Sequence, residues 1–240
     1  MFRVGRQLLA SGFVSAAVMP RRGVSKATLV YDDLRASIID LALKPGTQID
    51  KQEICGRLGI SRQPLAEAVA RLATERLVDV EPQKGTYVAR IRLSDVIEAA
   101  FVRRALEVAV AEASASAMDA SAIGRIERNL AFQEAAVVAQ DWNGFYALDV
   151  RFHEALSEGM GMRRLRTAID AARAPLERAR RLLLPAPGRS PDTLHEHRAI
   201  FEALKARNSE RAGAAMATHL DKLVAEVRRL AARQPDLFEA

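Results

Sequence analysis

The sequence predicts a mainly α-helical protein with two domains, and three observations support this. Residues 51–88 read as two short helices joined by a tight turn and followed by two short strands. Residues 94–232 carry apolar residues at helical spacing, without the period-two alternation that is typical of strands. The chain has 240 residues, of which 49% are hydrophobic, and this is enough for two cores. We therefore expect a small N-terminal domain with a little sheet and a larger C-terminal bundle.

Residues 1–25 are predicted to form a flexible N-terminal extension. The segment is apolar and basic and has no acidic residue before Asp32, a composition that also suits a signal or transit peptide. Its apolar runs are interrupted at Gly12 and Pro20, which favours the extension. No stretch of the sequence approaches the length needed to span a bilayer, so we expect no membrane partner.

A helix-turn-helix is expected within residues 26–90, after a first helix near residues 28–41. Gly59 allows the left-handed backbone of a tight turn, and the Ser61 hydroxyl can cap the helix that follows. The inward positions of this second helix are Leu65, Val69 and Leu72. Its other faces stay open, and such a helix can dock in a DNA major groove.

A hairpin follows the second helix directly. Residues 77–80 and 86–88 are its strands, and residues 81–85 form the turn between them. Lys84 and Gly85 at the tip offer a charge and a flexible backbone suited to lying along phosphates. Together the helices and the hairpin predict a winged helix-turn-helix.

The charge distribution supports a polyanionic partner for this domain. Residues 1–90 carry 14 Lys and Arg against 9 Asp and Glu, whereas residues 91–240 carry 22 against 21. The excess of positive charge therefore lies in residues 1–90, which contain the winged domain. The candidate DNA contacts are Lys51, Ser61, Arg62, Gln63, Arg71, Lys84 and Gly85. The alternative for its charged members is a solvated surface that contacts nothing.

Residues 34–78, LRASIIDLALKPGTQIDKQEICGRLGISRQPLAEAVARLATERLV, resemble the DNA-binding domain of the GntR family of bacterial transcription regulators. The resemblance is carried by the Lys-Pro-Gly bend, the Leu-Gly-Ile-Ser-Arg turn and the Glu-Ala pair of the second helix. The family usually has an arginine where this chain has Ala66 and a basic residue where it has Gln52. The resemblance therefore implies operator binding that is weaker or differs in site preference.

Six helices joined by short loops are expected after a short linker at residues 89–92. Such a pattern predicts an antiparallel bundle over residues 94–232. The helices are expected at about residues 94–117, 120–139, 141–158, 161–184, 190–207 and 209–232. The closing residues 234–240 are expected to be frayed.

Four polar residues lie on apolar faces of three of these helices. Asp149 and His153 are four residues apart on the third helix, and His197 and His219 share faces with apolar residues of later helices. Buried polar groups are costly unless they are satisfied, and one divalent transition metal can satisfy all four. Zinc is the simplest candidate, and nickel or another ion is possible. The alternatives are a surface Asp–His pair and core histidines that donate to carbonyls.

Most of residues 94–230 resemble the FCD ligand-binding domain of the FadR-type branch of the GntR family. The resemblance rests on Asp149-x-x-x-His153, the run from His197 and the His219-Leu220 pair, and six helices rather than seven point to the VanR-like subgroup. It implies a metal that helps to hold a small organic acid. Arg103, in an Arg-x-x-Leu-Glu run, is the candidate for binding the effector carboxylate, and a salt bridge to Glu107 is the alternative.

Together these observations predict a homodimeric bacterial transcription regulator, with repression favoured, that binds a double-stranded DNA operator and a small carboxylate effector. The single cysteine, Cys55, cannot form an internal disulfide and suits a cytoplasmic, nucleoid-associated protein. Two other functions stay open. One is a metal-dependent enzyme acting on a small organic acid, and the other is a protein that coats DNA without sequence preference.

Overall fold

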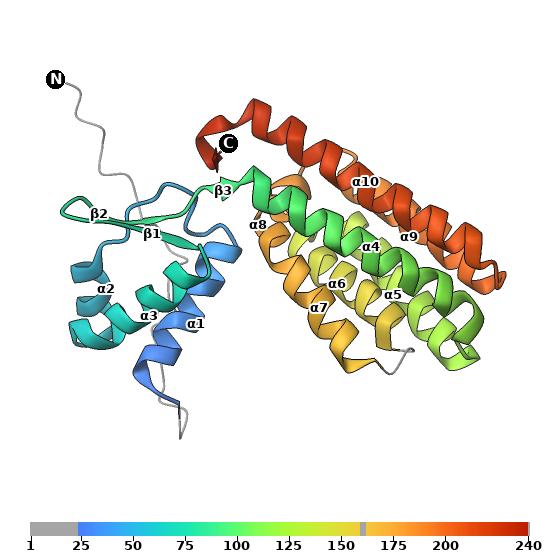
Figure 1. The fold of residues 1–240 in the computed structure, drawn as a ribbon, viewed down its shortest axis with the longest axis horizontal. Coiled ribbons are helices and arrows are strands. Elements are labelled where there is room, and N and C mark those ends of the chain that lie inside the picture. The colour runs from blue at the N-terminus through green and yellow to red at the C-terminus, as the bar shows by residue number, and fades with distance from the viewer. Residues whose placement is uncertain (1–23, 159–161, 240) are drawn as a thin grey trace. The chain divides into compact units, whose positions relative to one another are not determined.

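The computed structural model describes residues 24–158 and 162–239, apart from the side chain of Arg163. Residues 1–23 of the expected N-terminal extension lie outside this range. The chain divides into two compact units, one running to Ile91 and including Asp236–Glu239, and the other spanning Arg92–Pro235. The helices and strands of each unit are drawn in Figure 1. The mainly α-helical class is confirmed.

The first unit contains α1 (Lys26–Ile39), α2 (Lys51–Leu58) and α3 (Arg62–Thr74). Asp50 starts α2 by accepting hydrogen bonds from the backbone N–H groups of Gln52 and Glu53. Gly59 ends α2 in the left-handed conformation, with φ of 60°, as the turn requires. Ser61 occupies the N-cap position of α3, but the expected capping hydrogen bond from its hydroxyl is absent. Its carbonyl instead accepts a weak bond from the Cys55 thiol.

The wing is the antiparallel pair β1 (Val78–Glu81) and β2 (Gly85–Val88), with Val78 opposite Val88 and Glu81 opposite Gly85. The segment after the Lys-Pro-Gly bend extends this pair on the other side of β2, since Ile49 N–H donates to the Thr86 carbonyl. A buried apolar cluster links α1, α2, α3 and the hairpin. The winged helix-turn-helix is therefore present as predicted.

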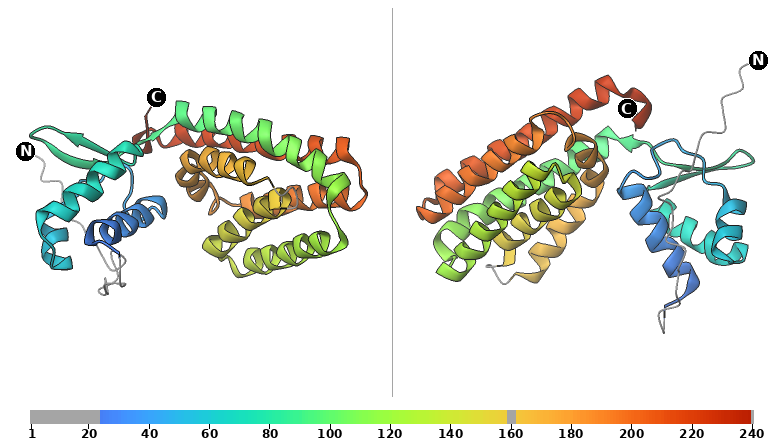
Figure 2. Two further views of the ribbon diagram at one scale, coloured as in Figure 1. Left: turned by 60° about the horizontal axis from the view of Figure 1, so that its bottom comes forward. Right: turned by 180° about the vertical axis from the view of Figure 1, so that it is seen from behind.

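The second unit is a helical bundle, and Figure 2 shows its layers from two further directions. Its helices are α4 (Leu93–Ala117), α5 (Ala120–Ala139), α6 (Trp142–Glu158), α7 (Arg163–Arg173), α8 (Glu177–Leu183), α9 (Arg189–Lys205) and α10 (Ser209–Arg233). Helix α10 packs along α4 and α9, and α5 packs along α6 and α9. The apolar faces of these helices form the buried core of the bundle.

The single helix predicted over residues 161–184 is interrupted. It consists of α7, the short 3-10 helix η1 (Ala174–Leu176) and α8. Pro175 explains the interruption, because proline has no N–H to donate and its ring crowds the preceding turn. The backbone stays right-handed through the break, so α8 still reaches the interior with Arg178, Ala179, Arg180 and Leu183 buried.

The C-terminal residues are not frayed as expected. The segment forms a 3-10 helix, η2 (Pro235–Leu237), and a strand, β4 (Phe238–Glu239), which pairs with β3 (Ile91–Arg92). Burial of Phe238 and Ile91 provides the reason, since both side chains leave water. Among the described residues, none of the helices has the length and apolar character needed to span a membrane.

Candidate metal centre and nucleic-acid interface

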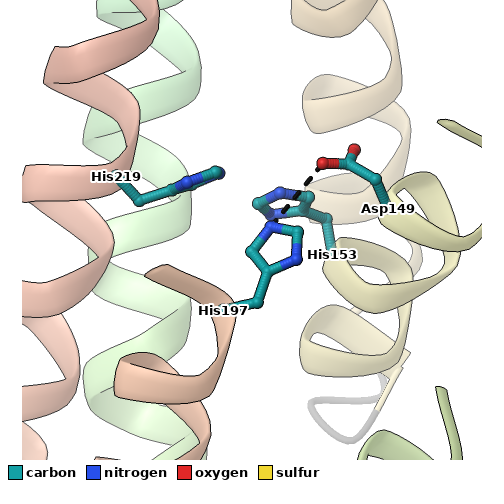
Figure 3. Close-up of side chains that lie close together, drawn as sticks. All are labelled: Asp149, His153, His197 and His219. Atoms are coloured by element: carbon teal, nitrogen blue, oxygen red, sulfur yellow. Dashed lines mark ion pairs between the residues drawn. The ribbon is translucent and has the colours of Figure 1, made fainter. Parts of the chain in front are cut away.

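Four buried side chains from three helices of the bundle converge on one point. Asp149 and His153 come from α6, His197 comes from α9 and His219 comes from α10 (Figure 3). One potential ligand atom from each of the four lies within 4.8 Å of the others. The pairing of Asp149 and His153 follows from their i, i+4 spacing, which places both on one helical face. The structure thus brings together the four residues that the sequence singled out.

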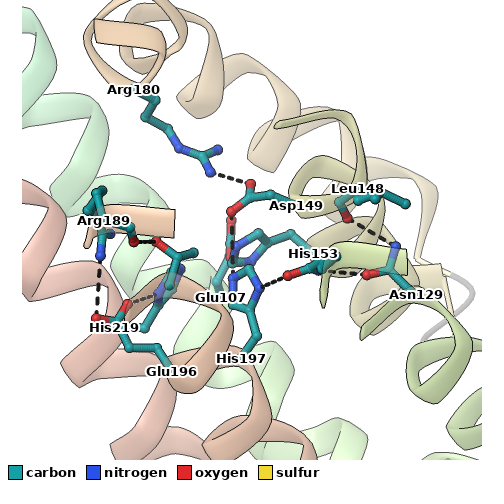
Figure 4. A network of polar contacts seen from close by, with 12 residues as sticks. Glu107, Asn129, Leu148, Asp149, His153, Arg180, Arg189, Glu196, His197 and His219 are labelled. Atoms are coloured by element: carbon teal, nitrogen blue, oxygen red, sulfur yellow. Dashed lines mark hydrogen bonds and ion pairs between the residues drawn. The ribbon is translucent and has the colours of Figure 1, made fainter. Parts of the chain in front are cut away.

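Each of the three imidazoles is held through its Nδ1 atom by an oxygen from a different helix (Figure 4). These contacts are His153 Nδ1 to Glu107 Oε2 at 2.5 Å, His197 Nδ1 to Gln133 Oε1 at 2.8 Å and His219 Nδ1 to Glu196 Oε2 at 2.7 Å. Because all three partners offer oxygen acceptors, we assign the proton of each ring to Nδ1, which leaves the Nε2 lone pair available.

The orientation of the Gln133 amide is itself fixed by hydrogen bonds. Its Nε2 donates to Asn129 Oδ1 at 2.7 Å, and Asn129 in turn donates to the Leu148 carbonyl at 3.0 Å. The amide oxygen of Gln133 therefore faces His197. This chain of bonds begins on the backbone of α6, the helix that carries two of the four converging residues.

The two oxygens of Asp149 face different partners. Its Oδ1 lies 3.6 Å from His197 Nε2, and its Oδ2 forms an ion pair with Arg180 of α8. Burial alone would raise the pKa of Asp149, but Arg180, and after it His153 and His197, hold this pKa well below its usual value. The carboxylate is therefore ionised and oriented, with one oxygen directed at the histidines.

Burial also keeps the imidazoles neutral. It lowers the pKa of His153 to about 4, with Glu107 opposing and Arg103 reinforcing the effect. Burial lowers the pKa of His219, and it lowers the pKa of His197 well below its ordinary value. Neutral imidazole is the form that binds a metal.

The residues present fit a divalent transition metal. Three imidazole nitrogens and one carboxylate oxygen form a donor set that suits zinc and related ions. The Nε2 atoms of His153 and His197 are buried and have no hydrogen-bond partner among the described residues. Such orphaned buried acceptors are costly, and one bound cation satisfies them together.

The shifted histidines predict a pH-dependent stability for the metal-free protein. The pKa of His153 is lower in the folded state than in the unfolded chain, so the unfolded state takes up the proton first as the pH falls. The resulting stability is fully present above about pH 6.5 and is lost toward pH 4. We expect the free energy of unfolding, from urea denaturation, to fall by about 2 kcal/mol between pH 7 and pH 5 from His153 alone. An equal free energy of unfolding at pH 7 and pH 5 would contradict this prediction. So would a loss of stability that disappears in His195→Ala.

Arg103 lies inside the bundle rather than on a surface. It is 1% exposed, and its Nε lies 2.6 Å from Glu107 Oε1, the same carboxylate that holds His153. The salt bridge considered from the sequence is thus present. Its Nη1 is buried and has no hydrogen-bond partner in the described part of the chain, so one donor remains available. Arg104 instead pairs with Asp221 on the exposed side of α4.

Two further buried donors lack an acceptor beside this centre. They are Nη1 of Arg180, whose guanidinium is paired with Asp149, and the hydroxyl of Tyr146, whose ring lies 5.2 Å from the Arg180 guanidinium carbon. Burial is the main reason that the pKa of Tyr146 is raised, so the hydroxyl keeps its proton and can donate. Among the described residues, neither Arg180 Nη1 nor the Tyr146 hydroxyl has a hydrogen-bond partner.

Sequence reasoning missed the roles of the residues that support the four candidate ligands, although Glu107 was named as a possible partner of Arg103. Glu107 and Glu196 had a detectable signal, since each is an acidic residue on a helix with an apolar inner face, and Glu196 precedes His197. Gln133 and Arg180 had none, because their roles depend on how α5 and α8 pack against α9 and α6. His195 is exposed, as its two-residue offset from His197 predicts.

In the winged domain, the candidate contacts fall at helix starts and at the hairpin tip. Arg62 is the first residue of α3 and Lys51 is the first residue of α2, and both are exposed. Ser61 is exposed beside Arg62. Gln63 donates to Glu67 one turn along α3, so a base contact would have to compete with this bond.

The remaining candidate DNA contacts are held by interactions or by backbone geometry within the domain. Arg71 stacks on the Tyr31 ring of α1, with its guanidinium carbon 3.6 Å from the ring centroid. Lys84 pairs with Glu81 across the hairpin turn at 3.4 Å and stays exposed. Gly85 has φ of +142°, a backbone conformation that L side chains rarely adopt, so glycine is favoured at the tip.

Comparison with known proteins assigns both units. Residues 26–88 match the family model of bacterial regulatory proteins of the gntR family, and residues 98–222 match the model of the FCD domain. The HTH-type transcriptional repressor RspR of Escherichia coli K12 is 31% identical over 87% of this chain and 92% of its own length. The chain belongs to the GntR family. This GntR-family chain is therefore a DNA-binding transcription regulator with an FCD domain, and not an enzyme.

Two other comparisons support the family assignment. The galactonate operon transcriptional repressor of Escherichia coli K12 is 26% identical to this chain, and the match covers 86% of this chain and 97% of that repressor. The solved structure of a GntR transcriptional regulator from Rhodococcus sp. RHA1 is 27% identical in sequence and has a TM-score of 0.68. The match covers 86% of this chain and 99% of the Rhodococcus chain. The two-domain architecture is thus common to this regulator and that structure.

Proposed function

We propose that this GntR-family regulator is a homodimeric repressor whose FCD bundle binds a divalent metal and a small carboxylate effector. The observation that carries the proposal is the convergence of Asp149 with three imidazoles, each held through Nδ1 by its own oxygen partner. Proteins that use histidine as a metal ligand fix the ring in this manner.

Asp149, His153, His197 and His219 are the proposed ligands, with zinc the simplest ion and nickel an alternative. A bound divalent ion would supply positive charge for an effector oxygen. Glu107, Gln133 and Glu196 keep the imidazoles in the binding tautomer, and Arg180 keeps Asp149 ionised and directed at the histidines.

A carboxylate is the proposed effector because the buried donors beside this centre lack acceptors. Arg103 and Arg180 each keep a free Nη1, and Tyr146 keeps a free hydroxyl, within the described residues. A guanidinium binds a carboxylate strongly, and the low dielectric of a buried site increases the attraction. Arg103 thus remains a candidate effector contact while it also supports Glu107.

The proposed mechanism is a population shift between arrangements of two winged domains. A dimer binds a two-fold operator when its recognition helices match the spacing of the half-sites, and an effector that favours another spacing releases the DNA. Repression is favoured because two of the relatives are named as repressors. Phe101 on α4 is 73% exposed and offers an apolar surface for a second copy.

In the winged domain, Arg62 is the proposed base contact, with Ser61 and Gln63 beside it on the recognition helix. Lys51, Lys84 and Gly85 are the proposed phosphate contacts. Arg71 is the weakest candidate, since leaving Tyr31 would cost its stacking contact. DNA coating without sequence preference remains the second candidate function, because phosphate contacts alone carry no sequence information.

Footprinting on the promoter region of the regulator's own gene tests the proposal. We expect the zinc-loaded protein to protect a discrete palindrome and expect one member of a set of small carboxylates, including acetate, malate and D-galactonate, to release it. Arg103→Gln and Arg180→Gln should keep the footprint and lose the response. Arg104→Gln, whose exposed side chain pairs with Asp221, is the matched control and should respond normally. A uniform smear would indicate coating, and insensitivity to every acid would contradict the effector assignment.

A further inference from the structure

The bundle has a cavity that none of the four candidate metal ligands lines. It has a volume of about 510 Å³ and is formed by the end of α8, the loop between α8 and α9, and the last turns of α10. All of its lining residues belong to the bundle, and small-molecule sites in proteins commonly have volumes of this order. None of the proposed effector contacts, Arg103, Arg180 or Tyr146, lines it.

The lining combines an apolar wall with an excess of positive charge. Leu182, Leu183, Ala186 and Leu230 contribute apolar surface. The charged lining residues are Arg189, Arg229 and Arg233 against Asp192 and Glu226, so the balance is three minus two, or +1. Such a cavity suits one acidic group attached to an apolar body.

Arg229 and Arg233 are the cations that a ligand can reach. They lie four residues apart on α10, so they share a face, and both are exposed. Neither forms an ion pair within 4 Å among the residues that the structure describes. Arg229 interacts electrostatically with Glu226, and a carboxylate placed between Arg229 and Arg233 would add two charge-assisted contacts.

Arg189 connects this cavity to the metal centre. It is buried, with Nε 2.6 Å from Glu226 Oε2 and Nη1 3.5 Å from Glu196 Oε1. The other oxygen of Glu196 accepts the Nδ1 proton of His219 at 2.7 Å, as Figure 4 shows. A change at Arg189 therefore reaches a candidate metal ligand through one shared carboxylate.

We propose that this cavity is a second ligand site, which binds an amphipathic monocarboxylate and is coupled to the metal centre through Arg189, Glu196 and His219. The site is separate from the effector contacts proposed above, and only its coupling depends on the proposed metal. A carboxylate that lies between Arg229 and Arg233 and also reaches Arg189 draws that guanidinium away from Glu196 Oε1, which then keeps only Lys222 Nζ, at 3.1 Å, as a cation partner among the described residues. Glu196 then holds the His219 proton more strongly, which makes this imidazole a better ligand.

The probe for the cavity itself is octanoate, with 1-octanol as its uncharged counterpart. We expect saturable binding of octanoate to the full-length, metal-free protein by calorimetry, and no binding of 1-octanol. The double variant Arg229→Gln/Arg233→Gln should lose about tenfold or more in octanoate affinity, the equivalent of one charge-assisted hydrogen bond. Arg228→Gln, an exposed neighbour outside the cavity, should bind as the wild type does.

The second measurement is zinc affinity, determined by competition with a chelator. Octanoate should raise the zinc affinity of the wild type by about fivefold, and zinc should raise the octanoate affinity by the same factor, since such coupling is reciprocal. Arg189→Lys keeps the charge but cannot hold both carboxylates, so it should still bind octanoate while losing the coupling.

Absence of saturable octanoate binding would overturn the proposal, as would equal losses in Arg228→Gln and the double variant. Octanoate binding that is lost in Arg180→Gln but kept in the double variant would place the ligand at the metal centre instead. Normal binding with unchanged zinc affinity would overturn the coupling. These outcomes need no DNA, so they are distinguishable from failure of the proposed repressor function.

Discussion

Replacing both His197 and His219 by alanine is expected to abolish zinc retention by the bundle. Wild-type protein should hold one zinc per chain after dialysis, because the four candidate ligands are buried and their ligand atoms already lie within 4.8 Å of one another. Loss of a supporting partner alone typically costs ten- to a hundredfold in metal affinity, so loss of two ligands should cost more than about a hundredfold. Elemental analysis of the dialysed proteins measures this directly.

The thermal effect of the metal provides the second readout for these variants. At zinc concentrations about a hundredfold above Kd, binding should stabilise the wild type by about 2.7 kcal/mol, which corresponds to roughly 5–10 °C in Tm for a chain of this size. The double variant should show no zinc-induced shift. Comparing shifts rather than absolute Tm values removes the cost of the cavity that alanine leaves.

His195→Ala is the matched control for this experiment, because His195 is exposed and lies two residues from His197. It should retain zinc and the full thermal shift. A double variant that remains fully loaded with metal would contradict the assignment. So would a wild type that binds no zinc or nickel at neutral pH, where burial leaves the imidazoles neutral.

The four candidate ligands could be predicted from the sequence because helical spacing is a local property. Asp149 and His153 share a helical face regardless of how the neighbouring helices pack. His197 and His219 interrupt apolar faces that were expected to point inward. The supporting partners depend on packing between helices distant in sequence. Nothing near Gln133 or Arg180 indicates that one meets His197 and the other Asp149.

The fold, too, was predictable where it depends on local sequence patterns and not where it depends on contacts between distant residues. Glycine turns and hydrophobic periodicity located the winged domain and most of the bundle. The break at Pro175 was missed because the apolar pattern continues on both sides of it. Pairing of Phe238–Glu239 with Ile91–Arg92 was missed because it joins residues far apart in sequence, and two-residue strands carry no pattern. The stacking of Arg71 on Tyr31 is long-range in the same sense.

Replacing Arg62 by alanine is expected to abolish specific operator binding. Arg62 is exposed at the first residue of α3, where a recognition helix approaches base edges. One bidentate contact to a base contributes about 1–3 kcal/mol, and a two-fold complex contains it twice. Operator affinity should therefore fall by at least about thirtyfold at a fixed salt concentration, measured by gel shift or fluorescence anisotropy.

Two variants separate base reading by Arg62 from its charge alone. Arg90→Ala removes an equal charge from an exposed position beyond the wing and should weaken operator and random DNA alike, by less than about tenfold. Ala66→Arg adds a guanidinium one helical turn along the exposed face of α3, four residues from Arg62, and should tighten binding. If Arg62→Ala lost no more specificity than Arg90→Ala, the base contact would be wrong. No gain from Ala66→Arg at low salt would mean that this face of α3 turns away from the groove.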